Sequence, residues 1–231
     1  GVQMNLSVKD AARLLSVSEK TIYRWIKQDV VPAYRVHEQY RFNRAELLEW
    51  ATSRRMGVAA ELLDEPESDA APLPLLSEAL EAGGIFYRVE GDNRERVLAE
   101  VAQHLRLPEE VDRGHLHQVL LARERIASTG IGEGIAIPHP RNPALLHLTR
   151  STVTLCFLEQ PVDFEALDGA PVRFLLTVIA PTLRSHLHLL SQLGFALKNP
   201  RFKKILTEEG SREEILAALR QAETELEASR P

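Results

Sequence analysis

The residues best suited to chemistry form a glycine-rich turn, an apolar strand and a histidine, in the order Ser128-Thr129-Gly130-Ile131-Gly132-Glu133-Gly134-Ile135-Ala136-Ile137-Pro138-His139. Closely spaced glycines let a backbone turn tightly and bring its N–H groups near an anion. Pro138 and Pro140 restrict the backbone on both sides of His139 and so fix where its imidazole points. Such a site could form a phosphohistidine. The alternative for the glycines is a β-bulge or tight turn with a histidine nearby by chance.

The whole string resembles the active-site segment of enzyme IIA domains of the bacterial phosphotransferase system, mannitol/fructose class, which includes the nitrogen-regulatory members. The similarity runs from Arg123-Glu124 to His139, and a second match is Ser185-His186-Leu187-His188-Leu189-Leu190. Together the two matches relate residues of roughly 75–225 to this family. The resemblance implies that His139 accepts a phosphoryl group from a histidine phosphocarrier protein of the HPr type.

The chemistry needs an exposed nucleophile that is neutral at working pH, and histidine has an unperturbed pKa of about 6.5. One ring nitrogen attacks the phosphoryl donor while a hydrogen bond holds the other. The phosphoryl group adds a charge of about −1.5 to −2. The resemblance assigns Arg123 as the balancing cation and His186 as a second histidine that donates to the phosphoryl group. The remaining expected donors are amides and hydroxyls of Ser128, Thr129, Gly130 and Gly132.

One position departs from the family pattern. The residue after the active histidine is usually glycine in the family, whereas this chain has Pro140. Proline has no N–H to offer a phosphoryl oxygen, and it disfavours the helical region for His139. A domain that has kept the fold and lost phosphotransfer therefore stays open as an alternative.

The N-terminal residues predict a helix-turn-helix. Ser7 is a good N-cap for a helix that ends near Leu15, and Ser18 for a second helix. In the second helix Ile22, Trp25 and Ile26 are predicted to pack inward. Its outward face then carries the residues expected to meet DNA in the major groove, namely Lys20, Tyr23, Arg24 and Lys27.

A hairpin wing is predicted next, because Tyr34-Arg35-Val36 and Tyr40-Arg41-Phe42 alternate around His37-Glu38-Gln39. Arg35 and Arg41 are expected to project from one face onto DNA phosphates. Asn43 can cap a third helix through Arg55. Residues 6–50 resemble excisionase-like, MerR-related helix-turn-helix domains, whose wings commonly turn on glycine. The alternative is a winged helix used for protein contact, with its charges merely solvated.

The composition suggests two domains in 231 residues, of which 44% are apolar and 26% charged. Residues 1–56 carry a net charge of +4, residues 57–76 carry −5 and residues 77–231 carry −4. This pattern suits a DNA-binding module at 1–56, an acidic linker with prolines at 57–74 and a second domain at 75–231. As flexible coil, such a linker spans roughly 20–25 Å. Because single small modules bind DNA weakly, a homodimer or a partner is implied.

Mixed strands and helices in the second domain predict an α/β fold, with a mixed sheet covered by helices on both faces. A strand is expected at Ile85–Val89, followed by helices capped by Asp92 and Asp112. Further strands are expected at 135–138, 151–158 and 172–180, and helices at 183–197 and 211–228. The last helix opens with a Ser-Arg-Glu-Glu capping box.

Several classes are not indicated by the sequence. The longest apolar run, Phe174 to Pro181, is too short to cross a bilayer, and no signal core is present, so a cytoplasmic protein without membrane contact is expected. The single Cys156 excludes an internal disulfide and is expected to be buried. The histidine pairs His115/His117 and His186/His188 are two residues apart and point to different helix faces. These histidine pairs therefore do not predict a metal site. The sequence also predicts no cofactor and no serine triad.

The sequence leaves three functions to compare. The first is a regulatory phosphocarrier in which phosphorylation of His139 alters binding of double-stranded DNA or contact with another protein. The second is a DNA-binding regulator or adaptor whose IIA-like domain no longer transfers phosphate. The third, a sugar-transport component, is disfavoured because a DNA-binding module has no role there.

Overall fold

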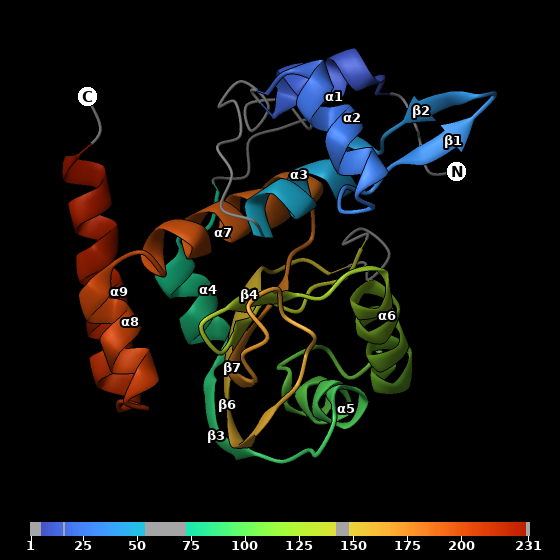
Figure 1. Ribbon diagram of the computed structural model, residues 1–231. Coiled ribbons are helices and arrows are strands. Elements are labelled where there is room, and N and C mark those ends of the chain that lie inside the picture. The colour runs from blue at the N-terminus through green and yellow to red at the C-terminus, as the bar shows by residue number, and fades with distance from the viewer. Residues whose placement is uncertain (1–5, 16, 54–72, 142–147, 230–231) are drawn as a thin grey trace. The chain divides into compact units, whose positions relative to one another are not determined.

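The structure is a computed structural model that describes residues 6–15, 17–53, 73–141 and 148–229 (Figure 1). The chain divides into two compact units, Gly1–Ala71 and Pro72–Pro231, which we call the head and the body. The predicted linker lies almost entirely outside the described residues. No helix in the described ranges combines the length and the apolar character needed to span a bilayer.

The head begins with the predicted pair of short helices, α1 (Val8–Leu14) and α2 (Glu19–Lys27). Ser7 caps α1 in a reciprocal capping box with Asp10, and the Ser18 side chain accepts from the amide of Thr21. Ile22 is fully buried and Trp25 stacks edge-on against Trp50, with ring centroids 5.3 Å apart. The N-terminal prediction is therefore confirmed at the level of individual caps.

The wing is the hairpin of β1 (Tyr34–Val36) and β2 (Gln39–Arg41), and α3 (Arg44–Ser53) follows it. Asn43 caps α3 by accepting from the amide of Glu46 at 2.9 Å. The turn residues His37 and Glu38 have φ of +49° and +65°, the left-handed pair that a two-residue hairpin turn requires. The turn thus has the geometry that glycine usually supplies, at a conformational cost of roughly 1 kcal/mol per residue.

The body is built on a five-stranded mixed sheet in the order β3-β6-β7-β5-β4, which confirms the predicted fold class. Its strands are β3 (Ile85–Val89), β4 (Gly130–Gly132), β5 (Ile135–Ala136), β6 (Thr152–Val162) and β7 (Val172–Ile179). β3 runs parallel to β6 and β5 runs parallel to β7, whereas β6 pairs antiparallel with β7 and β4 with β5. The parallel β5 and β7 end at the same edge of the sheet, which matters for the site.

Helices cover both faces of this sheet (Figure 1). One buried cluster joins the sheet to α4 (Leu76–Gly83), α7 (Leu183–Ala196), α8 (Pro200–Thr207) and α9 (Arg212–Ala228). A second cluster joins the opposite face to α5 (Arg94–His104) and α6 (Arg113–Ile126). Alternation along β6 divides the strand between them, with Phe157 in the first cluster and Cys156 in the second. Cys156 is buried as expected, and burial raises the pKa of its thiol to about 12, so the thiol stays protonated.

Two helices were not predicted, and one helix cap was assigned to the wrong residue. The helices α4 and α8 were not expected, because each is only eight residues long and α4 lacks a side-chain cap. The cap of α5 is Asn93, whose side chain accepts from the amide of Arg96, whereas Asp92 forms an ion pair with Arg96 at 3.8 Å. Asp112 and Ser211 cap α6 and α9 as predicted. The capping box predicted for α9 is only half formed, because the Ser211 side chain accepts from the Glu214 amide and the Glu214 carboxylate does not bond back to Ser211.

The contact between α4 and β6 yields a stability prediction. A Cβ on Gly83 would overlap the carbonyl oxygen of Val153 and stand 2.8 Å from Thr154 Oγ1, whereas a Cβ on Gly194 in α7 meets nothing within 4 Å. Alanine normally favours a helix over glycine by roughly 1 kcal/mol. We expect Gly194→Ala to be neutral or stabilising, and Gly83→Ala to lower the free energy of unfolding by roughly 1–3 kcal/mol. Urea unfolding of both variants decides the point, and equal effects would contradict the close packing.

Candidate functional site

The glycine-rich segment folds as a β-hairpin of β4 and β5. Glu133 and Gly134 form its two-residue turn with φ of +58° and +79°. The turn is fixed from outside, because the Glu133 amide donates to Asp168 at 2.8 Å and the Glu133 carboxylate pairs with Lys203. Gly132 therefore lies at the turn end of the hairpin and His139 follows its opposite end. Gly132 and Gly134 thus serve the tight turn that the sequence offered as the alternative to an anion-binding loop.

The loop that enters this hairpin bonds to groups of the protein itself. The Ser128 hydroxyl donates to the carbonyl of Phe164 and accepts from the Gly130 amide at 3.0 Å. The Thr129 amide and hydroxyl both donate to the carboxylate of Glu124, at 2.9 and 2.5 Å. An incoming phosphoryl group would thus have to displace a partner from Ser128 or Thr129. The sequence pattern of hydroxyls and glycines did not reveal these internal bonds.

His139 stands at the end of the strand that β5 begins. The Ile137 amide donates to the Thr129 carbonyl at 2.9 Å, and the Val178 amide donates to the Pro138 carbonyl at 3.0 Å. The Ile137 carbonyl lies 2.6 Å from His139 Nδ1. A carbonyl can only accept, so Nδ1 carries the proton and Nε2 keeps its lone pair. The backbone thereby selects Nε2 as the nucleophilic nitrogen.

His186 reaches the same place from the other parallel strand. β7 ends beside the end of β5, and α7 begins after β7 with Thr182 as its N-cap, so the first turns of α7 lie at this edge. The rings of His139 and His186 have centroids 5.2 Å apart and planes inclined by 57°. The resemblance to the family paired these two histidines. They are 47 residues apart in the sequence, and they meet because the strands that precede them end at the same edge of the sheet.

Arg123 completes the group from the C-terminal turn of α6. Its Nη1 donates to the Ala127 carbonyl at 2.7 Å, and its side chain is buried. Its positive charge contributes to lowering the pKa of both histidines. The structure therefore brings Arg123, His139 and His186 together, and the loop residues Ser128 and Thr129 lie next along the chain from Arg123.

Burial keeps both imidazoles neutral. Desolvation lowers the pKa of His139 well below 6.5, and the positive charge of Arg123 and the proximity of His186 add to that effect. Desolvation and then Arg123 lower the pKa of His186 to about 4. A neutral His139 is the nucleophilic form. The expected exposure of its ring is not found in this structure, since His139 is only 2% exposed.

The ring nitrogens of His186 are buried and have no hydrogen-bond partner among the described residues. A buried polar group without a partner costs roughly 1–3 kcal/mol, so the site gains by receiving a group that bonds to it. An anion with several acceptor oxygens would accept a hydrogen bond from the protonated ring nitrogen of a neutral His186. No sequence pattern predicts this unpaired state.

Glu124 is a site residue that sequence reasoning missed. It is 2% exposed, and desolvation raises the pKa of its carboxyl while the Thr129 hydrogen bonds and Arg123 oppose the shift. The sequence feature that could have identified Glu124 is its position next to Arg123, at the start of the segment that resembles the family.

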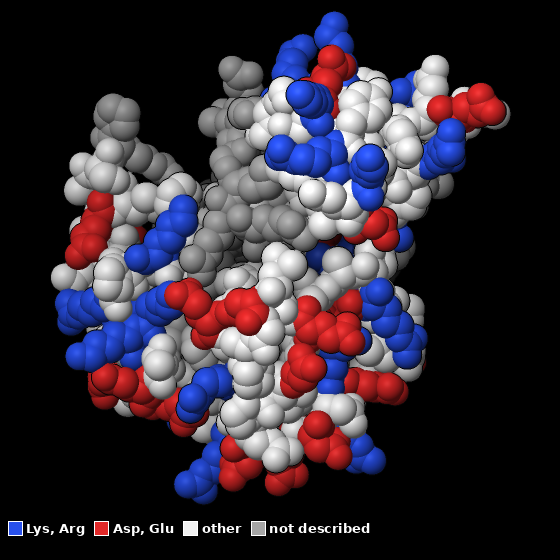
Figure 2. Space-filling view, viewed as in Figure 1, with Lys and Arg blue, Asp and Glu red and all other residues white. Residues whose placement is uncertain are grey.

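The outward face of α2 carries the predicted DNA-contacting residues. Lys20, Tyr23, Arg24 and Lys27 are all exposed, and Tyr23 is 53% exposed despite its aromatic ring. Figure 2 shows lysine and arginine side chains, in blue, over the α1 and α2 part of the head. This surface suits an anionic partner.

The prediction that Arg35 and Arg41 share one face of the wing is wrong. The register pairs Arg35 with Tyr40 and Arg41 with Tyr34, and cross-strand partners point to the same face, so the two arginines point to opposite faces. Arg35 lies over the Tyr40 ring at 5.9 Å, and Tyr40 meets Tyr23 edge-on at 6.3 Å. The Arg35 face is thus continuous with α2.

Arg41 belongs to the opposite face of the wing. Its Nη2 donates to Gln39 at 2.7 Å. Hydrogen bonds from Ser7 hold the pKa of Asp10 below its usual range, and Arg41 adds to that effect from the wing. On the same face the Tyr34 hydroxyl donates to Glu46 at 2.8 Å. These contacts tie this face to α1 and α3.

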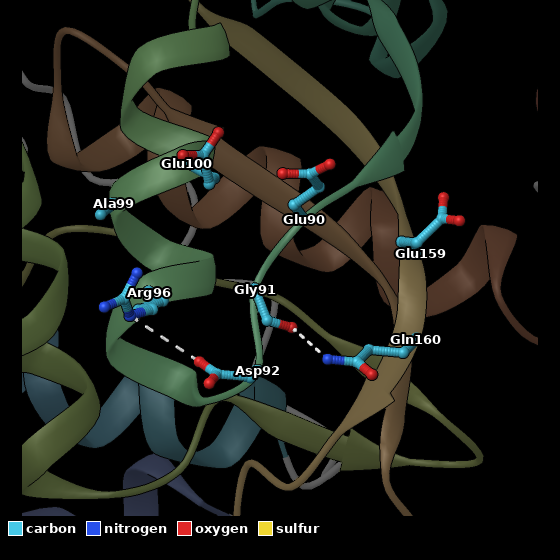
Figure 3. Close-up of a pocket in the computed structure, with 8 residues that line it drawn as sticks. All are labelled: Glu90, Gly91, Asp92, Arg96, Ala99, Glu100, Glu159 and Gln160. Carbon is cyan, nitrogen blue, oxygen red and sulfur yellow. Dashed lines mark hydrogen bonds and ion pairs between the residues drawn. The ribbon is translucent and has the colours of Figure 1, made fainter.

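A surface hollow of about 490 Å³ lies between the end of β3, α5 and β6 (Figure 3). Its lining includes four carboxylates, those of Glu90, Asp92, Glu100 and Glu159. Arg96 pairs with Asp92, and Gln160 donates to the Gly91 carbonyl at 3.3 Å. Four carboxylates disfavour a phosphoryl anion, and the predicted site residues do not line this hollow.

Two family models match the chain. The model of the phosphoenolpyruvate-dependent sugar phosphotransferase system, EIIA 2, matches residues 78–222, and a helix-turn-helix domain model matches residues 6–55. The nitrogen regulatory protein of Pseudomonas aeruginosa is 39% identical over 127 residues, which cover 53% of this chain and 79% of that protein. The nitrogen regulatory protein of Escherichia coli is 33% identical over 134 residues, covering 55% of this chain and 78% of that protein.

Solved structures agree with this fold. The nitrogen regulatory protein IIA-Ntr from Neisseria meningitidis matches with a TM-score of 0.56 and 29% identity, over 63% of this chain and 99% of that chain. The IIA mannitol structure from Escherichia coli matches with a TM-score of 0.50 and 23% identity, over 60% and 96% of the two chains, which supports the fold alone.

The neutral His186 predicts how stability depends on pH. The folded protein keeps His186 unprotonated down to about pH 4, whereas the unfolded chain binds a proton below about pH 6.5. Its contribution is fully present above pH 6.5 and is lost as the pH falls. Between pH 6.5 and 5 we expect the free energy of unfolding to fall by about 2 kcal/mol more in wild type than in His186→Asn. Urea unfolding at both pH values measures the difference, and parallel losses would mean that His186 is not held neutral.

Proposed function

This chain belongs to the family of EIIA type 2 domains of the phosphoenolpyruvate-dependent sugar phosphotransferase system, and on that premise we propose that it is a regulatory phosphocarrier. His139 accepts a phosphoryl group from a histidine phosphocarrier protein of the HPr type, and the head couples the phosphorylated state to DNA binding or to contact with a partner. The observation that carries this proposal is the His139 Nδ1 contact with the Ile137 carbonyl, next to Arg123 and an unpaired His186.

The transfer follows from the tautomer of His139. Nε2 attacks the phosphorus of the donor's phosphohistidine, the donor's P–N bond breaks, and its electron pair returns to the donor imidazole. A new P–N bond forms at Nε2. The proton on Nδ1 stays on the ring, where its hydrogen bond to the Ile137 carbonyl stabilises the positive charge that the imidazole acquires.

Arg123 and His186 stabilise the phosphoryl group after transfer. The planar guanidinium suits phosphate oxygens, and its low exposure strengthens the interaction. His186 donates an N–H from one ring nitrogen to a phosphoryl oxygen. We retain Ser128, Thr129 and Gly130 as further proposed contacts, although each would first exchange a partner within the protein. Gly132 lies at the turn end of the hairpin, away from His139, and is left out of this set.

A second function is favoured by two observations at the same residue. Pro140 offers no N–H to a phosphoryl oxygen, and the His139 ring is 2% exposed, so a carrier needs a state in which this ring is more open. Under this alternative the body keeps the fold without transferring phosphate, and the protein is a DNA-binding regulator or adaptor.

Nitrogen regulatory relatives support a regulatory role over sugar transport. The head supports DNA as the regulated partner because α2 and the Arg35 face of the wing form one basic and aromatic surface. Specific sites are usually read by paired modules, so we propose that the head acts as a dimer or beside a partner.

Phosphotransfer is tested by incubating the protein with labelled phosphoenolpyruvate, enzyme I and an HPr-type carrier. We expect an acid-labile label on wild type and on His188→Ala, whose ring bonds to the Pro74 carbonyl, and none on His139→Ala. We expect His186→Ala to accept the label roughly 10–100 times more slowly. Unlabelled wild type, or equal label on His139→Ala, would reject phosphotransfer and leave the adaptor.

DNA binding is tested with the full chain on genomic fragments over a range of salt concentrations. Arg24→Ala and Arg35→Ala are expected to weaken binding and reduce its salt dependence, because each removes a cation from the contact surface. Arg41→Ala is the matched control and is expected to bind nearly as wild type does, since its side chain lies on the other face of the wing. A larger loss in Arg41→Ala than in Arg35→Ala would contradict this assignment of faces.

A further inference from the structure

The buried carboxylate of Glu124 has an unusual pair of partners. Both of its oxygens accept from one residue, with the Thr129 amide 2.9 Å from Oε1 and the Thr129 hydroxyl 2.5 Å from Oε2. Glu124 lies in the last turns of α6, and Thr129 lies five residues later at the start of the hairpin. The side chain therefore clamps the loop between helix and hairpin.

This clamp is the first step of a hydrogen-bond path to the nucleophile. The Thr129 carbonyl accepts from the Ile137 amide at 2.9 Å, and the Ile137 carbonyl lies 2.6 Å from His139 Nδ1. Each step passes from one polar group of a residue to the carbonyl of the same residue, so the orientation of Thr129 influences the position of the Ile137 carbonyl. The position of that carbonyl in turn determines whether Nδ1 has an acceptor.

A carboxylate is suited to this role because it only accepts hydrogen bonds. The amide and the hydroxyl of Thr129 therefore both donate to the Glu124 carboxylate. The Thr129 carbonyl accepts from the Ile137 amide. A glutamine of the same shape would present an N–H₂ group to one of those donors. Burying a carboxylate is unfavourable unless it is well bonded, and Arg123 beside it provides a compensating charge.

We propose that Glu124 is a positioning residue for phosphoryl transfer, which acts through Thr129 and Ile137 to keep the proton of His139 on Nδ1 and the lone pair on Nε2. This role rests on the proposed function, and it extends that function to a residue that touches neither the phosphoryl group nor the ring of His139. Fixing the reactive nitrogen before the donor arrives removes the need to reorganise the site during transfer.

A purely structural role for Glu124 makes a different prediction. A residue that only stabilised the end of α6 would change the free energy of unfolding without changing the tautomer of a folded His139. Because His139 is neutral near pH 7, its two tautomers can be distinguished by the ¹⁵N chemical shifts of the ring nitrogens. The tautomer is therefore the readout that separates the two roles.

The experiment uses ¹⁵N-histidine-labelled full-length protein at pH 7 in four forms: wild type, Glu124→Gln, Thr129→Val and Thr129→Ser. We expect wild type to carry the proton on Nδ1, and both Glu124→Gln and Thr129→Val to shift population toward the Nε2-protonated form. Thr129→Ser keeps the hydroxyl that donates to Glu124, so its His139 is expected to keep the proton on Nδ1. In the phosphotransfer assay we expect Glu124→Gln and Thr129→Val to accept phosphate roughly 10–100 times more slowly.

Thr129→Val protects the test against misfolding, because it removes one hydroxyl and leaves the bond from the Thr129 amide to Glu124 intact. Folded Thr129→Val and Glu124→Gln proteins with a wild-type tautomer and rate would overturn the proposal. If wild type accepts no phosphate, the proposed function fails, while the tautomer shifts still decide whether Glu124 positions His139.

Discussion

The hydrogen bond between His139 Nδ1 and the Ile137 carbonyl is the constraint on which the candidate site depends. It assigns the ring proton to Nδ1, leaves the lone pair on Nε2, and couples the histidine to its own strand. Everything that fixes the Ile137 peptide therefore affects the chemistry. The hairpin holds that peptide through Thr129, and β7 holds the next one through Pro138.

The sheet topology explains why these residues meet. Parallel β5 and β7 end at one edge, and each is followed by a histidine: His139 two residues beyond Ile137, and His186 in the first turns of α7. The third member, Arg123, comes from the C-terminal turn of α6, which packs on the opposite face of the sheet from α7. A cation and two imidazoles therefore converge from three separate elements, and burial keeps both imidazoles neutral.

The sequence predicted the elements with strong local signals. Ser7, Ser18, Asn43, Asp112 and Ser211 all cap the helices they were expected to cap. The helices α4 and α8 were not predicted, because eight residues are too few to show a clear helical periodicity of apolar residues. The faces of Arg35 and Arg41 were assigned wrongly because a hairpin's faces depend on register, and one residue of offset reverses them.

The candidate site was only partly accessible to sequence reasoning. His139 and its neighbours stand in one continuous string, but the match to His186 and Arg123 came from resemblance to a family. Partners of buried groups were not predictable, because Glu124 and Thr129 are bonded through a geometry that only the folded loop defines. The glycines indicated a tight turn. The N–H and hydroxyl groups near them donate to other groups of the protein and so hold the hairpin in place.

The most direct measurement is the nitrogen that carries phosphorus after incubation with an HPr-type phosphoryl donor. Phosphorus–nitrogen coupling in the ¹⁵N-histidine-labelled protein identifies that atom. The account predicts a single phosphohistidine, at Nε2 of His139, with the proton retained on Nδ1. Phosphorus on Nδ1 of His139, or on another histidine, would contradict it.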